Sequence, residues 1–364
     1  MDARIQLQTF LAAIGLLACG AACGGVIERA GTPGAWGGKF ISCHAPEATL
    51  GVVRGARSTT VYQATAKGID WKYVLPQTVG KSDQIWAAPD GKGAVIAVTM
   101  HQKGSSRNFH VSEAGPVEVD GGLVAVDYQA DRVMIVTSAP RLAHTYRVRV
   151  FERSPWKLVG DSTFTSDFGD GFRRFSVRLT RDGQSYYYLD GAMAPTVRDA
   201  IAGQEVPLGF EFAPGGIDDL LLYSDADGFA VMGNRLYALR PNHALEVVPV
   251  PGRQYVDSLL ETGDARLQPV RFAYGWGMLD RQARRWRMVS DDPVSAIHSQ
   301  GAMLTVVNSP VGKDSVEVFD FSGSTPALVA TADKPGPAQA VVCANPYGYM
   351  RYADGAFSWH RLDR

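Results

Sequence analysis

The sequence has no excess of either charge. Its 36 Lys and Arg side chains nearly balance its 37 Asp and Glu side chains, which leaves a formal net charge of −1 in a chain of 364 residues. Proteins that bind nucleic acid, or that adsorb to an acidic membrane surface, carry a clustered basic excess. The balance therefore argues against nucleic acid as a partner, and against membrane attachment through a basic surface.

The residues of local catalytic and metal-binding motifs are also scarce. The seven histidines form no His-x-His or His-Glu-x-x-His motif, and the four cysteines form no cluster with them at zinc spacing. Gly-x-Ser-x-Gly and Gly-x-x-x-x-Gly-Lys-[Ser/Thr] are absent as well. We therefore predict no metal, cofactor or catalytic residue. Catalysis by histidines that only the fold brings together stays open.

The longest apolar run is too short to span a bilayer as a helix. It covers Phe10 to Ala22, 13 residues, where about 20 are needed. A short apolar run that follows Arg4 and precedes small residues is typical of a secretory signal. We therefore predict export.

The end of this run resembles the lipobox of bacterial lipoproteins. Leu16-Leu17-Ala18-Cys19 matches its pattern, with Leu17 as a less usual middle residue, and Cys23 is a second, poorer candidate. The resemblance implies lipidation of Cys19 and a periplasmic protein anchored to the outer membrane, since Gly20 follows. We predict a signal peptide or lipobox over 1–23, a flexible tether over 24–38 and a folded domain over 39–364.

Removing the leader leaves two cysteines near opposite ends of the mature chain, Cys43 and Cys343. In an oxidising compartment such a pair can form a disulfide, provided that the fold brings the chain ends together. Two unrelated buried thiols are the alternative.

Short β-rich runs separated by turn residues fill the chain from about residue 50 to residue 362. They include GAVIAVTM, RVMIVTS, TYRVRVFE, SYYYLDG, AMLTVVN and DSVEVFDF, at 93–100, 132–138, 145–152, 185–191, 302–308 and 314–321. No stretch of 12 or more residues has a convincing helical period, so an all-β fold is predicted. Tyr186, Tyr187 and Tyr188 cannot all face one way on a strand. We expect at least one of them to be exposed or to line a channel.

Two markers repeat with a period of about 43 residues. The pattern Trp-[Lys/Arg]-x-Val begins at Trp71, Trp156 and Trp286, at separations of 85 and 130 residues. Asp-Gly turns that precede alternating strands begin at residues 90, 182, 227 and 354, at separations of 92, 45 and 127 residues. A further similarity relates VRVFE at 148–152 to VEVFD at 316–320.

A unit of this length that holds four short strands has the size of a β-propeller blade. About 320 residues predict seven blades, with eight as the main alternative and six after it. We expect the last strands, around 341–361, to pair with strands from residues 39–54 and to close the ring.

Individual segments resemble known propeller repeats. Ala88-Pro89-Asp90-Gly91-Lys92 is similar to the strand opener of TolB-like and WD40-like propellers, and residues 61–75 resemble a degenerate quinoprotein repeat. Each resemblance covers one or two blades. They imply the architecture of an exported bacterial β-propeller, and no functional residue.

Two groups of side chains are candidates for binding. Arg284, Arg285, Trp286 and Arg287 combine residue types that are common at protein interfaces, although a solvated strand face would look the same. The acidic turns at 167–171 and 224–228 could supply some calcium ligands, but Asp and Gly are also ordinary turn residues.

Two functions of different classes remain. The first is a non-catalytic scaffold of the cell envelope, expected to be a monomer, which holds an unknown protein or glycan on a propeller rim or in its funnel. The alternative is a propeller enzyme of lactonase, glycosidase or quinone-dependent type, with its site in the central funnel. The lack of catalytic motifs favours the scaffold.

Overall fold

The computed structural model describes twenty segments of the chain. They are residues 27–30, 42–44, 48–54, 58–65, 68–76, 85–88, 93–99, 106–129, 131–139, 144–166, 177–189, 195–208, 212, 216–240, 245–252, 254–260, 264–308, 314–334, 341–353 and 356–362. All regular structure in these segments is β-strand, which confirms the all-β prediction. None of them contains a helix long and apolar enough to cross a membrane.

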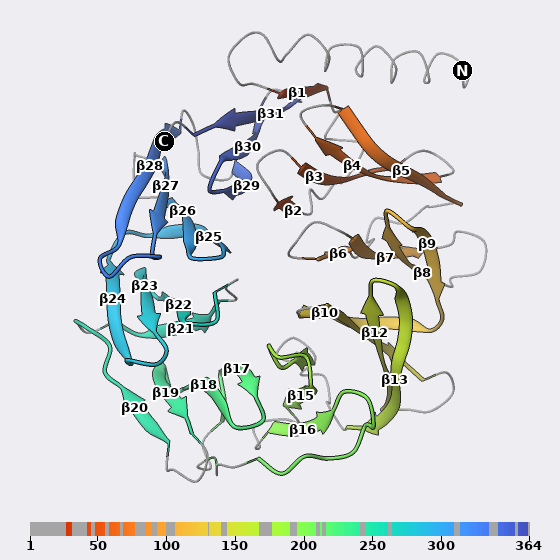
Figure 1. Cartoon of the computed structure of the whole chain (residues 1–364), viewed down its shortest axis with the longest axis horizontal. Coiled ribbons are helices and arrows are strands. Elements are labelled where there is room, and N and C mark those ends of the chain that lie inside the picture. The colour runs from red at the N-terminus through yellow and green to blue at the C-terminus, as the bar shows by residue number, and fades with distance from the viewer. Residues whose placement is uncertain are drawn as a thin grey trace.

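The strands form antiparallel sheets that follow one another around a ring (Figure 1). We number the sheets in chain order. Sheet 1 contains β2 (Ser42–His44), β3 (Ala48–Arg54), β4 (Ser58–Thr65) and β5 (Gly68–Pro76). Sheet 2 contains β6 (Ile85–Ala87), β7 (Gly93–Thr99), β8 (Ser106–Ser112) and β9 (Gly115–Val119). Sheet 3 contains β10 (Gly122–Gln129), β11 (Arg132–Ser138), β12 (Thr145–Arg153) and β13 (Trp156–Thr165). Sheet 4 contains β14 (Arg178–Leu179), β15 (Ser185–Leu189) and β16 (Pro195–Asp199).

The second half of the chain repeats this arrangement. Sheet 5 contains β17 (Asp219–Ser224), β18 (Asp227–Met232), β19 (Arg235–Leu239) and β20 (Glu246–Val248). Sheet 6 contains β21 (Val256–Leu259), β22 (Leu267–Phe272), β23 (Gly275–Asp280) and β24 (Arg285–Ser290). Sheet 7 contains β25 (Val294–Gln300), β26 (Met303–Asn308), β27 (Asp314–Asp320) and β28 (Ala327–Lys334). Sheet 8 contains β29 (Val341–Asn345), β30 (Gly348–Ala353), β31 (Ala356–Arg361) and β1 (Ile27–Ala30).

The described residues thus form eight sheets, where the first prediction was seven and eight was its alternative. The period of about 43 residues was right, and a strand from the N-terminal part does pair with the last strand, but the predicted range of 39–54 for that strand was wrong. Residues 39–54 hold β2 and β3 of sheet 1, and β31 instead pairs with β1, from Ile27↔Trp359 to Ala30↔Ala356. The segment predicted as a tether over 24–38 therefore contributes a strand to the last sheet. Sheets 1 and 8 lie side by side, since β2 contacts β29 (Figure 1).

Strands in the middle of a sheet are apolar on both faces because a neighbouring sheet covers each face. Tyr186, Tyr187 and Tyr188 on β15 are 0%, 1% and 4% exposed, so the expectation that one of them would be exposed was wrong. Tyr186 and Tyr188 pack with residues of sheet 3, and Tyr187 packs with residues of sheet 5. Period-2 alternation reports which face a side chain occupies, and here both faces are buried.

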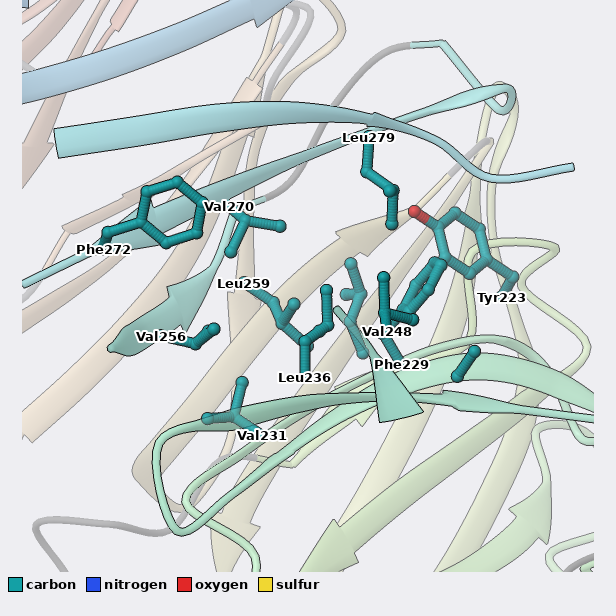
Figure 2. Close-up of a cluster of buried hydrophobic side chains, with 12 residues drawn as sticks. Tyr223, Phe229, Val231, Leu236, Val248, Val256, Leu259, Val270, Phe272 and Leu279 are labelled. Carbon is teal, nitrogen blue, oxygen red and sulfur yellow. The ribbon is translucent and has the colours of Figure 1, made fainter. Parts of the chain in front are cut away.

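Six separate hydrophobic clusters lie between consecutive sheets in the described part of the chain, at every junction from sheets 2 and 3 to sheets 7 and 8. Figure 2 shows the cluster between sheets 5 and 6, in which Phe229 and Leu236 of sheet 5 meet Val270 and Leu279 of sheet 6. Burial of this apolar surface is the main force that holds the sheets together.

The sequence repeats correspond to equivalent strands. Trp71, Trp156 and Trp286 all lie on the fourth strands of their sheets, two and then three sheets apart. VRVFE and VEVFD lie on the third strands of sheets 3 and 7. In both of these strands the pairing register shifts at the same Val-Phe step, at Val150–Phe151 and at Val318–Phe319.

Carboxylates on first strands also fasten neighbouring sheets. The Asp127 carboxylate on β10 accepts a 2.7 Å hydrogen bond from the Leu179 N–H of sheet 4. In the same way, Asp219 on β17 accepts a 2.7 Å bond from the Leu259 N–H of sheet 6, and its other oxygen lies 3.6 Å from Arg178 of sheet 4. Asp219 therefore links three consecutive sheets.

Replacing Asp219 with Ala should lower the free energy of unfolding by about 2 kcal/mol, because a largely buried backbone N–H loses its charged acceptor. The exposed neighbour Asp218 is the matched control, and Asp218→Ala should change stability by less than about 0.5 kcal/mol. Urea unfolding of the two variants measures both values. Equal losses would contradict the fastening function of Asp219.

Candidate functional site

Sheet 6 presents different chemistry at its two ends. Its strands are antiparallel, so the start of β21, the β22–β23 turn and the end of β24 lie at one end of the sheet. The β21–β22 loop and the β23–β24 turn lie at the other end. The predicted arginine cluster belongs to this second end.

Two arginines of the β23–β24 turn bond to sheet 5. Arg281 forms an ion pair with Asp227 of β18, donates to the Ala265 carbonyl, and its guanidinium lies 3.2 Å from the centre of the Tyr223 ring. Burial raises the pKa of Tyr223 to about 12. Arg284 has a left-handed backbone, with φ 53°, and forms an ion pair with Glu246 of β20. Asp227 lies in the acidic turn that we considered for calcium, and its partner here is Arg281.

The predicted binding residues on β24 are mostly engaged as well. The Trp286 Nε1–H donates to the Pro249 carbonyl at 2.7 Å, and its ring packs edge-on against Phe272. Arg287 donates to the Phe321 carbonyl at 2.7 Å and to the Gly323 carbonyl, both of sheet 7. Only the Arg285 side chain of this set is exposed. Arg284, Trp286 and Arg287 thus join sheet 6 to its neighbours on both sides.

The other end of sheet 6 carries four exposed side chains that sequence reasoning missed, Tyr255, Tyr274, Asp291 and Asp292, beside the half-buried Gln254. We call these five residues the tyrosine rim. Tyr255 precedes β21 and is 62% exposed, and Tyr274 lies in the β22–β23 turn and is 71% exposed. They are the two most exposed large hydrophobic side chains in the described segments.

The backbone of the tyrosine rim is held by several short contacts. The Ala273 N–H donates to the Tyr255 carbonyl at 2.9 Å, and Gln254 Nε2 donates to Asp291 Oδ1 at 2.6 Å. Gly275, at φ 121°, follows Tyr274. A Cβ there would lie 2.1 Å from the Ser290 carbonyl oxygen, so only glycine fits. The two tyrosines are therefore exposed rings on a fixed backbone.

A sequence signal for this rim exists, but it is weak. Tyr274 stands between RFA at 271–273 and GWGMLD at 275–280, and a large side chain at a tight hairpin turn points to solvent. Tyr255 follows Pro251-Gly252, and it could be recognised as exposed only after β21 was placed.

Several other predicted positions cannot be placed relative to the tyrosine rim. Cys19, Cys23 and the acidic turn at 167–171 lie outside the described residues. Cys43 lies on β2 and Cys343 on β29, two strands that contact each other. In the described segments, no three His, Cys, Asp or Glu side chains gather as ligands of a metal ion.

His110 is a buried histidine with a strongly lowered pKa. It lies on β8, is 2% exposed, and stacks on Trp156 of sheet 3 with a centroid distance of 3.8 Å. Neither ring nitrogen has a hydrogen-bond partner among the described residues. Burial, with a smaller contribution from the charge of Arg153, lowers the pKa of His110 to about 3. His110 is therefore a neutral packing residue between sheets 2 and 3.

Comparison with known proteins gives a fold. No protein-family model matches the chain, and no curated protein matches it. A solved structure from a study of two prolyl endopeptidases is similar, with a TM-score of 0.53 and 12% identity over 93% of this chain. Sqt1 of Saccharomyces cerevisiae is similar over 91% of this chain and 97% of its own, with a TM-score of 0.52 and 11% identity.

The fold is a β-propeller. The chain spans 55% of the length of the prolyl endopeptidase chain. BamB from Moraxella catarrhalis covers 89% of this chain at 14% identity, with a TM-score of 0.44. At these identities the likenesses show the architecture, and they assign no residue of this propeller a function.

Acid should destabilise the propeller through His110. Below about pH 6.5 the unfolded chain binds a proton at this position, whereas the folded protein binds it only near pH 3. Stability present above pH 6.5 is therefore lost, by about 1.4 kcal/mol per pH unit, as the pH falls toward 3. When the pH falls from 7 to 5, the free energy of unfolding of His110→Phe and of His110→Gln should each decrease by about 2 kcal/mol less than that of the parent protein.

Urea unfolding at the two pH values measures this difference. His144 is exposed and has a left-handed backbone, so His144→Asn is the control and should follow the parent protein. Parallel pH dependence in the parent and in both His110 variants would refute the assignment.

Proposed function

We propose that this propeller is a non-catalytic scaffold that holds a partner protein on its tyrosine rim. The observation that carries the proposal is the pair of exposed tyrosines on a fixed backbone. Tyr255 and Tyr274 leave most of their ring surface in water, although the strands on which they depend are buried.

Tyrosine is enriched at the energetic centres of protein interfaces. Its ring offers a large contact area and loses little conformational entropy when it binds, and its hydroxyl can satisfy polar groups of a partner. A rim whose backbone is already fixed also loses less entropy on binding. These properties support a protein ligand for the rim.

We also propose that the propeller is a closed ring of eight blades in the bacterial envelope. The pairing of β1 with β31 supports the closure of the ring, because a strand from the N-terminal part completes the last sheet. The contact between β2 and β29 supports a disulfide between Cys43 and Cys343, which an oxidising compartment would allow. Cys19 would carry the lipid that anchors the protein to the outer membrane.

A double substitution tests the binding proposal. The protein with Tyr255→Ala and Tyr274→Ala should recover at least tenfold less of a partner protein from cross-linked envelope extract than the parent does. Leu158→Ala with Val247→Ala removes two similarly exposed apolar side chains from other sheets and should retain the partner. Arg285→Ala should retain it too.

Three outcomes would contradict the binding proposal. They are recovery that does not depend on the tyrosines, recovery that depends on Arg285 instead, and capture of a glycan in place of a protein. Unchanged urea unfolding curves would show that the variants are folded.

The location is tested separately, by expression of the full chain in a bacterial host. Mass spectrometry of the mature protein should find a diacylglycerol-modified Cys19 at its N-terminus and a peptide that links Cys43 to Cys343. Cys19→Ser should release the protein from the membrane fraction. An unmodified N-terminus in the soluble fraction would contradict anchoring, and reduced thiols at both positions would contradict the disulfide.

A further inference from the structure

We infer that the partner segment on the tyrosine rim presents lysine or arginine side chains. This inference rests on the proposed function, since it names the chemistry of the partner at that same rim. It starts from the carboxylates that flank the two tyrosines.

The described donors to two of these carboxylates are neutral. Asp291 accepts from the Gln254 amide at 2.6 Å, and Asp292 accepts from the Ser290 hydroxyl at 3.0 Å. Both aspartates are exposed. A carboxylate can accept several hydrogen bonds, so each exposed carboxylate can also accept one from a cationic donor.

A third carboxylate extends the negative surface along β21. Asp257 stands two residues after Tyr255, at the register shift of β21, and its side chain is 59% exposed. Among the described residues, the Arg271 Nε lies 3.9 Å from its carboxylate. Arg271 also donates to the Val294 carbonyl of sheet 7 at 3.1 Å, so its guanidinium is shared with the neighbouring sheet.

Tyrosine rings beside carboxylates suit a cationic side chain. A lysine or arginine can lie over the electron-rich face of the ring while its charged group bonds to a carboxylate. The opposite end of sheet 6 differs, because Arg281 and Arg284 there already form ion pairs with Asp227 and Glu246 of sheet 5. Arg235, the first residue of β19 in the neighbouring sheet 5, is exposed. Because it would repel a cationic segment, we expect the partner not to cover it.

Two peptides of matched length test the inference directly. The probes are a fluorescently labelled peptide of alternating glycine and lysine and its glycine–glutamate counterpart, titrated against the full chain at 50 and 300 mM salt. The lysine peptide should bind more tightly than the glutamate peptide, and its affinity should fall at the higher salt. Asp291→Asn with Asp292→Asn should weaken it at least fivefold.

The matched control is Asp225→Asn with Glu205→Gln, which removes two exposed carboxylates far from the rim in sequence and should leave affinity unchanged. The inference would be overturned if the lysine peptide does not bind, if both peptides bind equally, or if the two double variants lose affinity equally. If capture of the partner depends on Tyr255 and Tyr274 but not on Asp291 and Asp292, this inference is overturned and the proposed function stands. Capture that is indifferent to the tyrosines as well would also overturn the proposed function.

Discussion

No sheet of this protein can cover its own apolar surface, and the rest of the structure depends on that constraint. Among the described residues, central strands such as β11 bury apolar side chains on both faces, from Val133 to Val136, so such a sheet needs a neighbour on each side. A linear row would leave two such faces in water, whereas a ring leaves none. The contact between sheets 8 and 1 and the pairing of β1 with β31 are consistent with this requirement.

The same constraint explains why so many charged residues serve as structure. Polar groups at the edge of a buried junction must find partners there, because an unsatisfied group costs about 1–3 kcal/mol. Asp219, Arg281 and Arg287 each reach a neighbouring sheet for this reason. Arginines and a tryptophan that would suggest a binding surface from the sequence alone instead bond across the junctions between sheets. The exposed tyrosines lie at the end of sheet 6 where backbone groups bond to one another, as the Ala273 N–H does to the Tyr255 carbonyl.

The sequence predicted the repeat well and its count less well. Strand placement, the period of 43 residues and the equivalence of the tryptophan segments all follow from local patterns that survive in single blades. The blade count failed because the eighth sheet borrows Ile27–Ala30 across more than 300 residues, and no local pattern carries such a pairing. The burial of Tyr187 and the contacts of Arg281 could not be predicted from the sequence for a related reason, since both depend on which sheet lies alongside. The tyrosine rim became visible only when the two ends of sheet 6 were distinguished.

Hydrogen exchange during a urea titration, read by mass spectrometry sheet by sheet, tests the central claim most directly. If every sheet depends on both neighbours, the strands of all eight sheets should lose protection together at one urea concentration, β31 included. Exchange that begins in one group of sheets and leaves another protected at the same urea concentration would contradict the account. It would mean that some sheets are stable without the ring.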